Sequence, residues 1–296
     1  MPLVASWILA NKKGKPLVWI EPVVDRSAQT VSYVIREGGA PTCERTVERG
    51  NGTCIATGSA ITGDYIKEQG RSGRHGAQLL AVVAEGPRSR TYLASSDEQV
   101  EAAACAMPDW LPAGHMSDHP QYMGTHRYGL DEWWKLFSPR QLVALTTFSD
   151  LLCDVRERVR EDALAAGSTD DDVRLRDSGS GAAAYADAVV TYLAFAIDKS
   201  ADYWSTTCSW HNTGEKIRNT FGRQAIPMTW DWAETNPFSS STGNWMAMVD
   251  WVRKAVEHLP ASGVGEVVQR DARARVHKLP GVSVSTDPPY YDAVPY

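Results

Sequence analysis

The sequence predicts a mixed α/β protein, and three observations lead to that prediction. Short β-type runs separated by glycine-rich turns fill residues 1–95. Apolar residues recur at helical spacing within residues 131–262. Residues 263–296 contain two short apolar runs that each lead to an aspartate, an arrangement typical of strands in a parallel α/β sheet. A helix and a loop in residues 96–130 link the first two regions.

The composition is that of a globular protein that does not enter a membrane. Hydrophobic residues make up 43% of the chain and charged residues 22%, so the chain can bury a core. No apolar run approaches the roughly 20 residues of a membrane span, and the first residues lack the pattern of a signal peptide. We therefore expect a cytoplasmic protein. The formal net charge of −6 gives no support to nucleic-acid binding by the surface as a whole.

The first region is expected to consist of short strands and one helix. Residues 17–20 form an apolar run, and residues 31–35 alternate apolar and polar side chains, as a strand with one buried face does. Residues 77–84 and 90–93 are expected to be two further strands. A short helix is expected at residues 64–69.

Helices are expected to dominate the middle of the chain. A helix at residues 97–107 is expected to begin after Ser96, because serine is a good N-cap. Ser138 and Pro139 give a strong start signal for a long helix, since serine caps a helix and proline fits its first position. Another helix is expected at residues 244–258.

A second long helix is expected at residues 182–203. The Ser-Gly-Ser-Gly sequence before it, residues 178–181, mimics a nucleotide-binding loop. The charged residues 172–177 do not make the buried strand that such a loop needs, so we interpret it as a helix-entry loop. One stripe of this helix is expected to face the core; it consists of Tyr185, Val189, Tyr192, Leu193 and Ala196.

Two aspartates follow the apolar runs of the last region. Residues 265–268 lead to Asp271, and residues 281–285 lead to Asp287, the first residue of an Asp-Pro-Pro-Tyr sequence. Ligands bind outside the carboxyl ends of the strands in parallel sheets, so we expect a site here in which Asp271 contacts the adenine of a cofactor. A surface aspartate and a proline-rich turn are the alternative interpretations, and the residues alone leave both open.

The Asp-Pro-Pro-Tyr sequence suits methylation of an amino group on an aromatic ring. The lone pair of such a nitrogen is delocalised, so an enzyme needs two acceptors that hold the amino hydrogens and favour a tetrahedral nitrogen. The Asp287 carboxylate and the Pro288 carbonyl can be these acceptors, because Pro288 and Pro289 have no N–H to donate. Tyr290 offers a ring on which a flipped base can stack. Positioning the nitrogen in line with a sulfonium methyl group would then accelerate methyl transfer.

Residues 282–292 resemble the catalytic motif of the adenine-specific DNA methylases that contain a zinc ribbon, the DUF1156 group linked to phage defence. The resemblance is not confined to that loop and spans nearly the whole chain. Further similar segments are residues 138–150, 184–189, 218–221, 224–228, 230–231 and 236–238.

The resemblance implies methyl transfer from S-adenosylmethionine to adenine N6 in DNA. It also implies a partial Rossmann-like methyltransferase core in residues 263–296, preceded by a degenerate zinc-ribbon-like region in residues 1–95 and a helical insertion. The catalytic residues would be Asp287, Pro288, Pro289 and Tyr290, and Asp271 would contact the cofactor. The substrate-binding candidates are Tyr291, Arg218, Asn219, Trp230 and Asp231; for the last four, which the resemblance places in the helical segment, helix surface and core packing are the alternatives.

Two departures from the family pattern limit these expectations. Thr57 stands where a cysteine would complete a Cys-x-x-Cys pair with Cys54, so no metal site is expected. No Phe-x-Gly-x-Gly type cofactor loop occurs, so the chain is expected to be an internal piece of an enzyme, inactive alone. The alternatives are a non-catalytic remnant or split-enzyme subunit that binds DNA or a separate polypeptide supplying the missing halves, and an amino-methyltransferase acting on cytosine N4.

Overall fold

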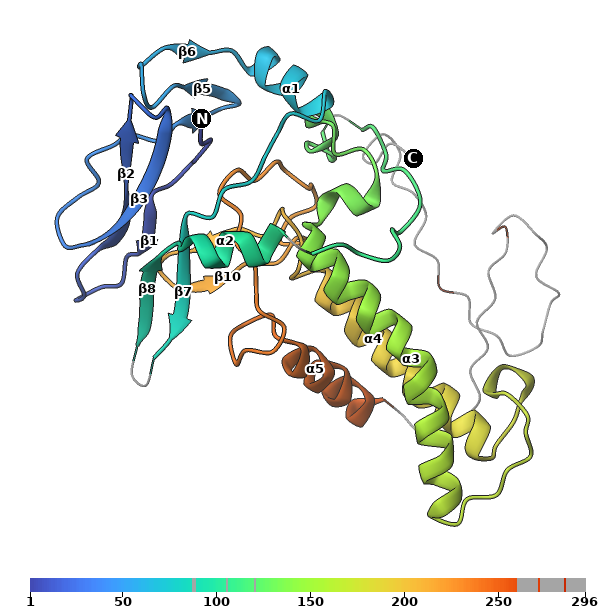
Figure 1. Cartoon of the computed structure of the whole chain (residues 1–296). Coiled ribbons are helices and arrows are strands. Elements are labelled where there is room, and N and C mark those ends of the chain that lie inside the picture. Colours follow the sequence, from blue (N-terminus) through green and yellow to red (C-terminus); the bar gives the residue numbers. More distant parts are fainter. Residues whose placement is uncertain (87–88, 105, 120, 260–270, 272–284, 286–296) are drawn as a thin grey trace. The chain divides into compact units, whose positions relative to one another are not determined.

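A computed structural model describes residues 1–86, 89–104, 106–119, 121–259, 271 and 285. Within these residues the chain is mixed α/β, with small antiparallel sheets and five α-helices (Figure 1), which confirms the predicted class. Met1–His258 form one compact unit, which contains the first two predicted regions whole and most of the third. The predicted Rossmann-like core lies outside the described residues, apart from Asp271 and Ser285.

The first sheet is built from three antiparallel strands in the order β1-β2-β3. β1 spans Ile8–Ala10, β2 spans Val18–Asp25 and β3 spans Thr30–Glu37, and β2 and β3 pair along their full length. The strands predicted at residues 17–20 and 31–35 are therefore confirmed. Consecutive side chains of a strand lie on opposite faces, so the buried Trp19 and Ile20 of β2 cover both faces of the sheet. On one of them a core cluster is formed by Val4, Trp7, Ile20 and Tyr33.

A second antiparallel sheet leads into the first helix. β4 (Val47–Glu48), β5 (Asn51–Thr53) and β6 (Ala60–Ile61) pair in that order. α1 (Gly63–Arg71) follows at once, and it begins where the Thr62 hydroxyl accepts a hydrogen bond from the backbone N–H of the third residue after it. The helix predicted at residues 64–69 is confirmed, with one or two more residues at each end.

A hairpin and a short helix follow. β7 (Ala81–Glu85) pairs with β8 (Arg90–Ala94), and α2 (Asp97–Ala104) begins after Ser96, whose hydroxyl accepts from the Gln99 N–H at 3.3 Å as predicted. β7 starts four residues later than expected, because the side chain of Gln78 bonds Tyr33 and Val31 instead of extending the strand. Helical structure is absent from residues 106 and 107, since a residue before proline avoids the α conformation.

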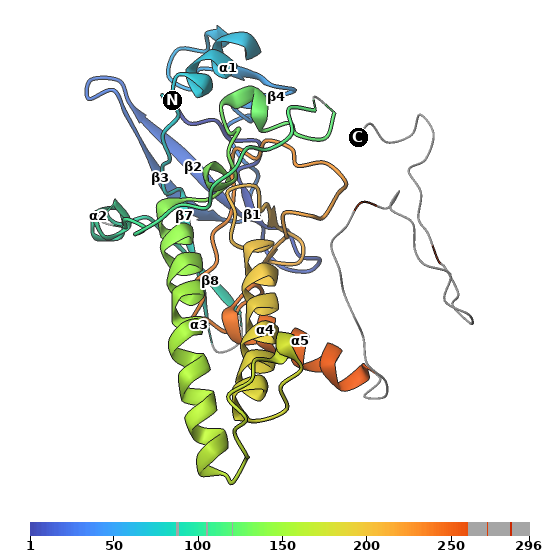
Figure 2. The ribbon, with the colours of Figure 1, turned by 90° about the vertical axis from the view of Figure 1, so that its right-hand side faces the viewer.

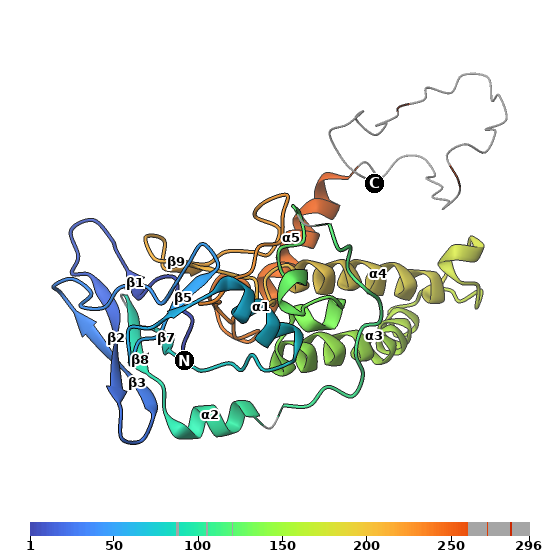
Figure 3. The same cartoon turned by 90° about the horizontal axis from the view of Figure 1, so that it is seen from above.

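The two longest helices lie side by side, as all three views show (Figures 1, 2 and 3). α3 (Pro139–Ala165) begins with a capping box, in which Ser138 and Gln141 exchange hydrogen bonds as the start signal predicted. α4 (Ala182–Ala201) begins after Gly181, which confirms the helix-entry interpretation of the glycine loop. Small side chains allow α4 to approach its neighbour closely; its buried alanines are Ala182, Ala183, Ala184, Ala186 and Ala196.

The predicted core stripe of α4 is partly wrong. Tyr185 is 59% exposed and Tyr192 is 38% exposed, whereas Ala196 is buried. The face of α4 that enters the core is the alanine face, which turns these two tyrosines outward. Helical spacing identified an apolar stripe but did not show which of two adjacent stripes is covered.

An aromatic cluster holds the last helix. α5 (Trp245–His258) confirms the helix expected at residues 244–258. The Phe148 ring of α3 stacks on Trp245 with ring centroids 4.4 Å apart, and it also contacts Trp204 at 5.9 Å. The Trp204 indole N–H donates to the Gly243 carbonyl at 2.7 Å, so this buried tryptophan connects the end of α4 to the start of α5.

Residues 202–244 contain no α-helix, although the middle region was expected to be helical. They form a hairpin of β9 (Trp210–His211) and β10 (Lys216–Ile217) and then irregular loops. The Trp210 indole N–H donates to the Leu9 carbonyl at 2.6 Å, so this segment packs against β1. Three 3-10 turns complete the described structure: η1 (His126–Tyr128), η2 (Trp133–Leu136) and η3 (Leu175–Asp177). None of the helices in the described part of the chain is long and apolar enough to cross a bilayer.

Candidate functional site

The predicted catalytic loop lies outside the described residues. This holds for Asp287, Pro288, Pro289 and Tyr290, and for the neighbouring substrate candidate, Tyr291. Their roles therefore remain predictions. The cofactor candidate Asp271 is described; it is exposed and belongs to no helix or strand.

The predicted substrate residues Arg218 and Asn219 do not share one site. They lie after β10 and not on a helix. The Arg218 side chain is exposed, and its backbone N–H donates to the Ser209 carbonyl at 2.8 Å. The Asn219 amide donates to both carboxylate oxygens of the buried Asp202, at 3.1 and 2.9 Å. Asn219 therefore anchors its loop to the end of α4 and has no amide hydrogen directed at a ligand.

Asp231 acts as another internal anchor. Its Oδ2 accepts from the backbone N–H of Ser6 at 3.0 Å, which joins the start of the chain to a loop that follows β10. Burial raises the pKa of Asp231 above its usual range. The carboxylate fixes the position of the neighbouring Trp230, a predicted substrate residue that lines a pocket.

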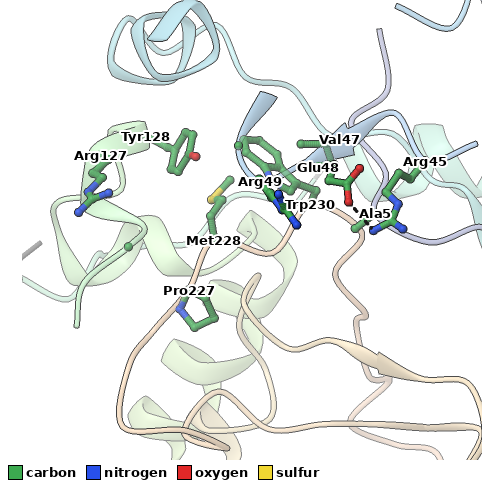
Figure 4. A pocket seen from close by; sticks show the side chains of 12 residues that line it. Ala5, Arg45, Val47, Glu48, Arg49, Arg127, Tyr128, Pro227, Met228 and Trp230 are labelled. Atoms are coloured by element: carbon green, nitrogen blue, oxygen red, sulfur yellow. Dashed lines mark ion pairs between the residues drawn. The ribbon is translucent and has the colours of Figure 1, made fainter. Parts of the chain in front are cut away.

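Trp230 lies in an open pocket of about 590 Å³ that joins four segments distant in sequence (Figure 4). One contains the turn between β4 and β5, the second contains η1, the third is the loop of residues 227–230, and the fourth contributes Ala5. The side chains that give the pocket its chemistry are Arg45, Glu48, Arg49, Arg127, Tyr128, Met228 and Trp230.

Two ring contacts hold Trp230 in place. Its ring centroid lies 5.0 Å from that of Tyr128 with the planes at 86°, and 5.7 Å from that of His75 at 74°. Edge-to-face pairs of this kind are favourable because a ring edge is positive and a ring face negative. Nε2 of His75 lies 3.0 Å from the Ile66 carbonyl, so this nitrogen is the protonated one. Desolvation lowers the pKa of His75, which favours the neutral ring.

Two glycines fix the position of Tyr128. Gly70, in the last turn of α1, lies so close to the Tyr128 carbonyl that a Cβ atom at position 70 would overlap it. Gly129 has φ +85°, and a Cβ there would lie 2.7 Å from the Gly70 carbonyl oxygen. Only glycine allows this approach. The contact places η1 against α1 and thereby places Tyr128 beside Trp230.

The pocket is locally basic although the chain is acidic. Three guanidinium groups and one carboxylate line it, so its formal charge is 3 − 1 = +2. Arg45 pairs with Glu48 at 3.4 Å. Such a mixture of guanidinium groups and aromatic rings can bind an anion that carries a planar group. Sequence reasoning missed Arg45, Arg49, Arg127 and Tyr128, because they come together only through contacts between distant segments.

The residues around Cys54 show what replaces the second cysteine of the expected pair. Among the described residues, no group of three or more histidine, cysteine or acidic side chains is placed to hold a metal ion. The Thr57 hydroxyl and the N–H groups of Ala56 and Thr57 face the Cys54 thiol and lower its pKa. The backbone turns back here, with the Gly58 N–H donating to the Cys54 carbonyl at 2.7 Å.

The Cys54 environment predicts an elevated reactivity. Replacing Thr57 by valine removes the hydroxyl that lowers the pKa of Cys54, so alkylation of Cys54 by iodoacetamide at neutral pH should slow about twofold, because a smaller thiolate fraction is partly offset by a more nucleophilic thiolate. Mass spectrometry of the Cys54 peptide over time measures the rate. Thr42→Val, an exposed threonine in the preceding loop, serves as the control. Equal rates in the two variants would show that Thr57 does not activate the thiol.

The comparisons with known proteins yield no relative. No protein-family model matches the chain, and no curated protein or solved structure is significantly similar to it. The resemblance to zinc-ribbon adenine methylases therefore stays a prediction from sequence motifs.

Proposed function

We propose that the chain is part of an S-adenosylmethionine-dependent methyltransferase that acts on adenine N6 in DNA. The observation that carries this proposal is the Asp-Pro-Pro-Tyr sequence at residues 287–290, directly after the apolar run at residues 281–285. An acceptor-only corner after a strand is what methylation of a ring amine needs, since it holds both amino hydrogens. The described unit adds a pocket that suits a nucleic-acid substrate, lined by guanidinium groups and by the ring of Trp230.

In this proposal the residues of the chain hold and orient the base. The Asp287 carboxylate and the Pro288 carbonyl accept hydrogen bonds from the N6 amino group. As the new N–C bond forms, the amino nitrogen loses one of its hydrogens as a proton, and the Asp287 carboxylate is placed to accept it. Tyr290 and Tyr291 pack against the flipped ring. S-adenosylmethionine would supply the methyl group. Asp271 is exposed in the structure, and its carboxylate can accept hydrogen bonds from the amino or hydroxyl groups of such a donor.

A second candidate function is DNA or partner binding without catalysis. The observation that favours it is that the described residues lining the basic pocket all belong to Met1–His258. In this reading a separate polypeptide supplies the cofactor-binding half. Calorimetric titration of the purified chain with S-adenosylmethionine distinguishes the candidates, because binding without a partner assigns the cofactor site to this chain.

The catalytic assignment predicts the result of one chromosomal substitution. Asp287→Ala in the native protein should abolish N6-methyladenine at its target sequence, because one of the two acceptors is lost. Mass spectrometry of digested genomic DNA measures the product and separates it from N4-methylcytosine, the product of the cytosine alternative. Asp198→Ala, which removes an exposed carboxylate of α4, serves as the control. Persistent N6-methyladenine in the Asp287→Ala strain would refute the assignment.

A further inference from the structure

Arg49 has a backbone conformation that arginine disfavours. Glu48 pairs with Asn51 across β4 and β5, so Arg49 and Gly50 alone form the turn between the strands. Their φ angles are +50° and +83°, the pattern of a type I′ turn. Asn-Gly is the favoured pair in such turns, because a residue with a bulkier side chain is strained at positive φ. The fold of the hairpin therefore gives no reason for an arginine at this position.

The Arg49 side chain also has no structural partner that would explain it. It is exposed, and within the described ranges no carboxylate forms an ion pair with it, whereas the adjacent Arg45 pairs with Glu48. Strained residues persist where function requires them. The location of Arg49 at the rim of the Trp230 pocket identifies the ligand that would require it as an anion (Figure 4).

The turn that carries Arg49 is held at a defined distance from the aromatic part of the pocket. A Cβ atom added to Gly50 would lie 3.4 Å from the Tyr128 hydroxyl oxygen, so the turn lies next to Tyr128. Gly63 approaches the Gly50 carbonyl from the start of α1. These contacts place the backbone of the turn that carries Arg49 beside Tyr128, which in turn contacts Trp230.

We propose that this pocket binds one strand of DNA, with Arg49 and Arg127 on the phosphates and the Trp230–Tyr128 pair against an unpaired base. That the ligand is DNA rests on the proposed function. That it is single-stranded rests on the pocket itself. Guanidinium groups bind phosphate through paired hydrogen bonds. Aromatic side chains bind bases of any sequence, and only unpaired bases expose a ring face to them. An acidic peptide would use the arginines but leave the rings without a role.

The proposal is tested with the full chain and Arg49→Asn. Asparagine relieves the turn strain, so this variant should be at least as stable as the wild type, which separates binding from folding. Fluorescence anisotropy with a short labelled single-stranded oligonucleotide at low salt should show affinity lowered about tenfold. The slope of log K against log salt should become shallower by about 0.7, the value for one lost phosphate contact.

Arg26→Asn is the matched control, since Arg26 is an exposed arginine in the turn between β2 and β3, outside the pocket. It should retain wild-type affinity.

Trp230→Phe should weaken binding of the oligonucleotide without changing the salt slope. Equal losses in Arg49→Asn and Arg26→Asn, or no binding by the wild type, would overturn the proposal. Displacement of the oligonucleotide by polyglutamate or inorganic phosphate as effectively as by unlabelled DNA would overturn the DNA assignment. The methylation assay of Asp287→Ala and this binding assay can each fail alone.

Discussion

Replacing Gly70 by alanine is expected to destabilise the Met1–His258 unit by about 1–3 kcal/mol, the range for forcing extra volume into a packed contact. The new Cβ atom would overlap the Tyr128 carbonyl and lie 2.8 Å from the His75 ring. A loss of stability would be informative, because Gly70 is inside α1 and replacing glycine by alanine within a helix otherwise stabilises it by about 1 kcal/mol. The close contact must outweigh that gain.

Urea denaturation followed by circular dichroism measures the effect, with Gly76→Ala as the control. Gly76 has no atom within 4 Å of an added Cβ and no positive φ, so its replacement should change the free energy of unfolding little. Gly70→Ala should also weaken oligonucleotide binding, since η1 and Tyr128 would shift. A Gly70→Ala chain as stable as Gly76→Ala would show that α1 and η1 do not pack as closely as described.

The elements that sequence reasoning predicted well are those specified by neighbouring residues. β2 follows from an apolar run and β3 from alternation, and the start of α3 follows from Ser138 as the N-cap and Pro139 at the first helical position. Residues 202–244 were missed because long-range contacts determine their path, such as the bonds from Trp210 to Leu9 and from Asp231 to Ser6. No local pattern encodes a partner more than 200 positions away.

The candidate site shows the same contrast between local and long-range information. Trp230 was selected from its own segment, but Arg49 and Tyr128 belong to segments that meet it only in the folded chain. One local signal was present, since an arginine directly before Gly50 is an unusual occupant of a tight hairpin turn. Arg218 and Asn219 were selected with Trp230 because they are polar residues of segments that resemble the family, and the structure places the Asn219 side chain on Asp202 instead.

Replacing Asp187 by asparagine is the second change expected to have a large effect. Asp187 is a buried residue of α4. Its Oδ1 accepts from Arg156 of α3 at 2.7 Å, and its Oδ2 accepts from Arg174 at 2.6 Å and from the Leu175 N–H at 3.0 Å. This carboxylate therefore fastens both α3 and the loop before η3 to α4. Asparagine keeps the shape but removes the charge that faces both guanidinium groups, and Arg156 then keeps only its ion pair with the exposed Glu157.

The expected loss is about 3 kcal/mol at neutral pH, the lower end of the range for breaking a buried ion pair, because the Arg174 side chain is 47% exposed. Arg174 and Arg156 hold the pKa of Asp187 far below its ordinary value of 3.8. A depressed pKa stabilises the folded state above the ordinary value, and this contribution is lost as the pH falls through and below it. The stability difference between wild type and variant should therefore be full at pH 7 and shrink below about pH 4.

Urea denaturation midpoints of the wild type and of Asp187→Asn, measured from pH 7 to below about pH 4, give the difference in stability. Asp162→Asn, which removes a carboxylate from α3, is the control. The Asp162 carboxylate pairs with Arg158 at 3.2 Å, but both side chains are largely exposed, so its loss should cost less than about 1 kcal/mol at any pH. If Asp187→Asn and Asp162→Asn unfold at the same urea concentration at pH 7, the contact between α3 and α4 does not depend on this carboxylate. If the Asp187→Asn difference persists unchanged at acid pH, the loss comes from altered packing, because below about pH 4 protonation of Asp187 in the unfolded wild-type chain reduces the electrostatic contribution of this carboxylate.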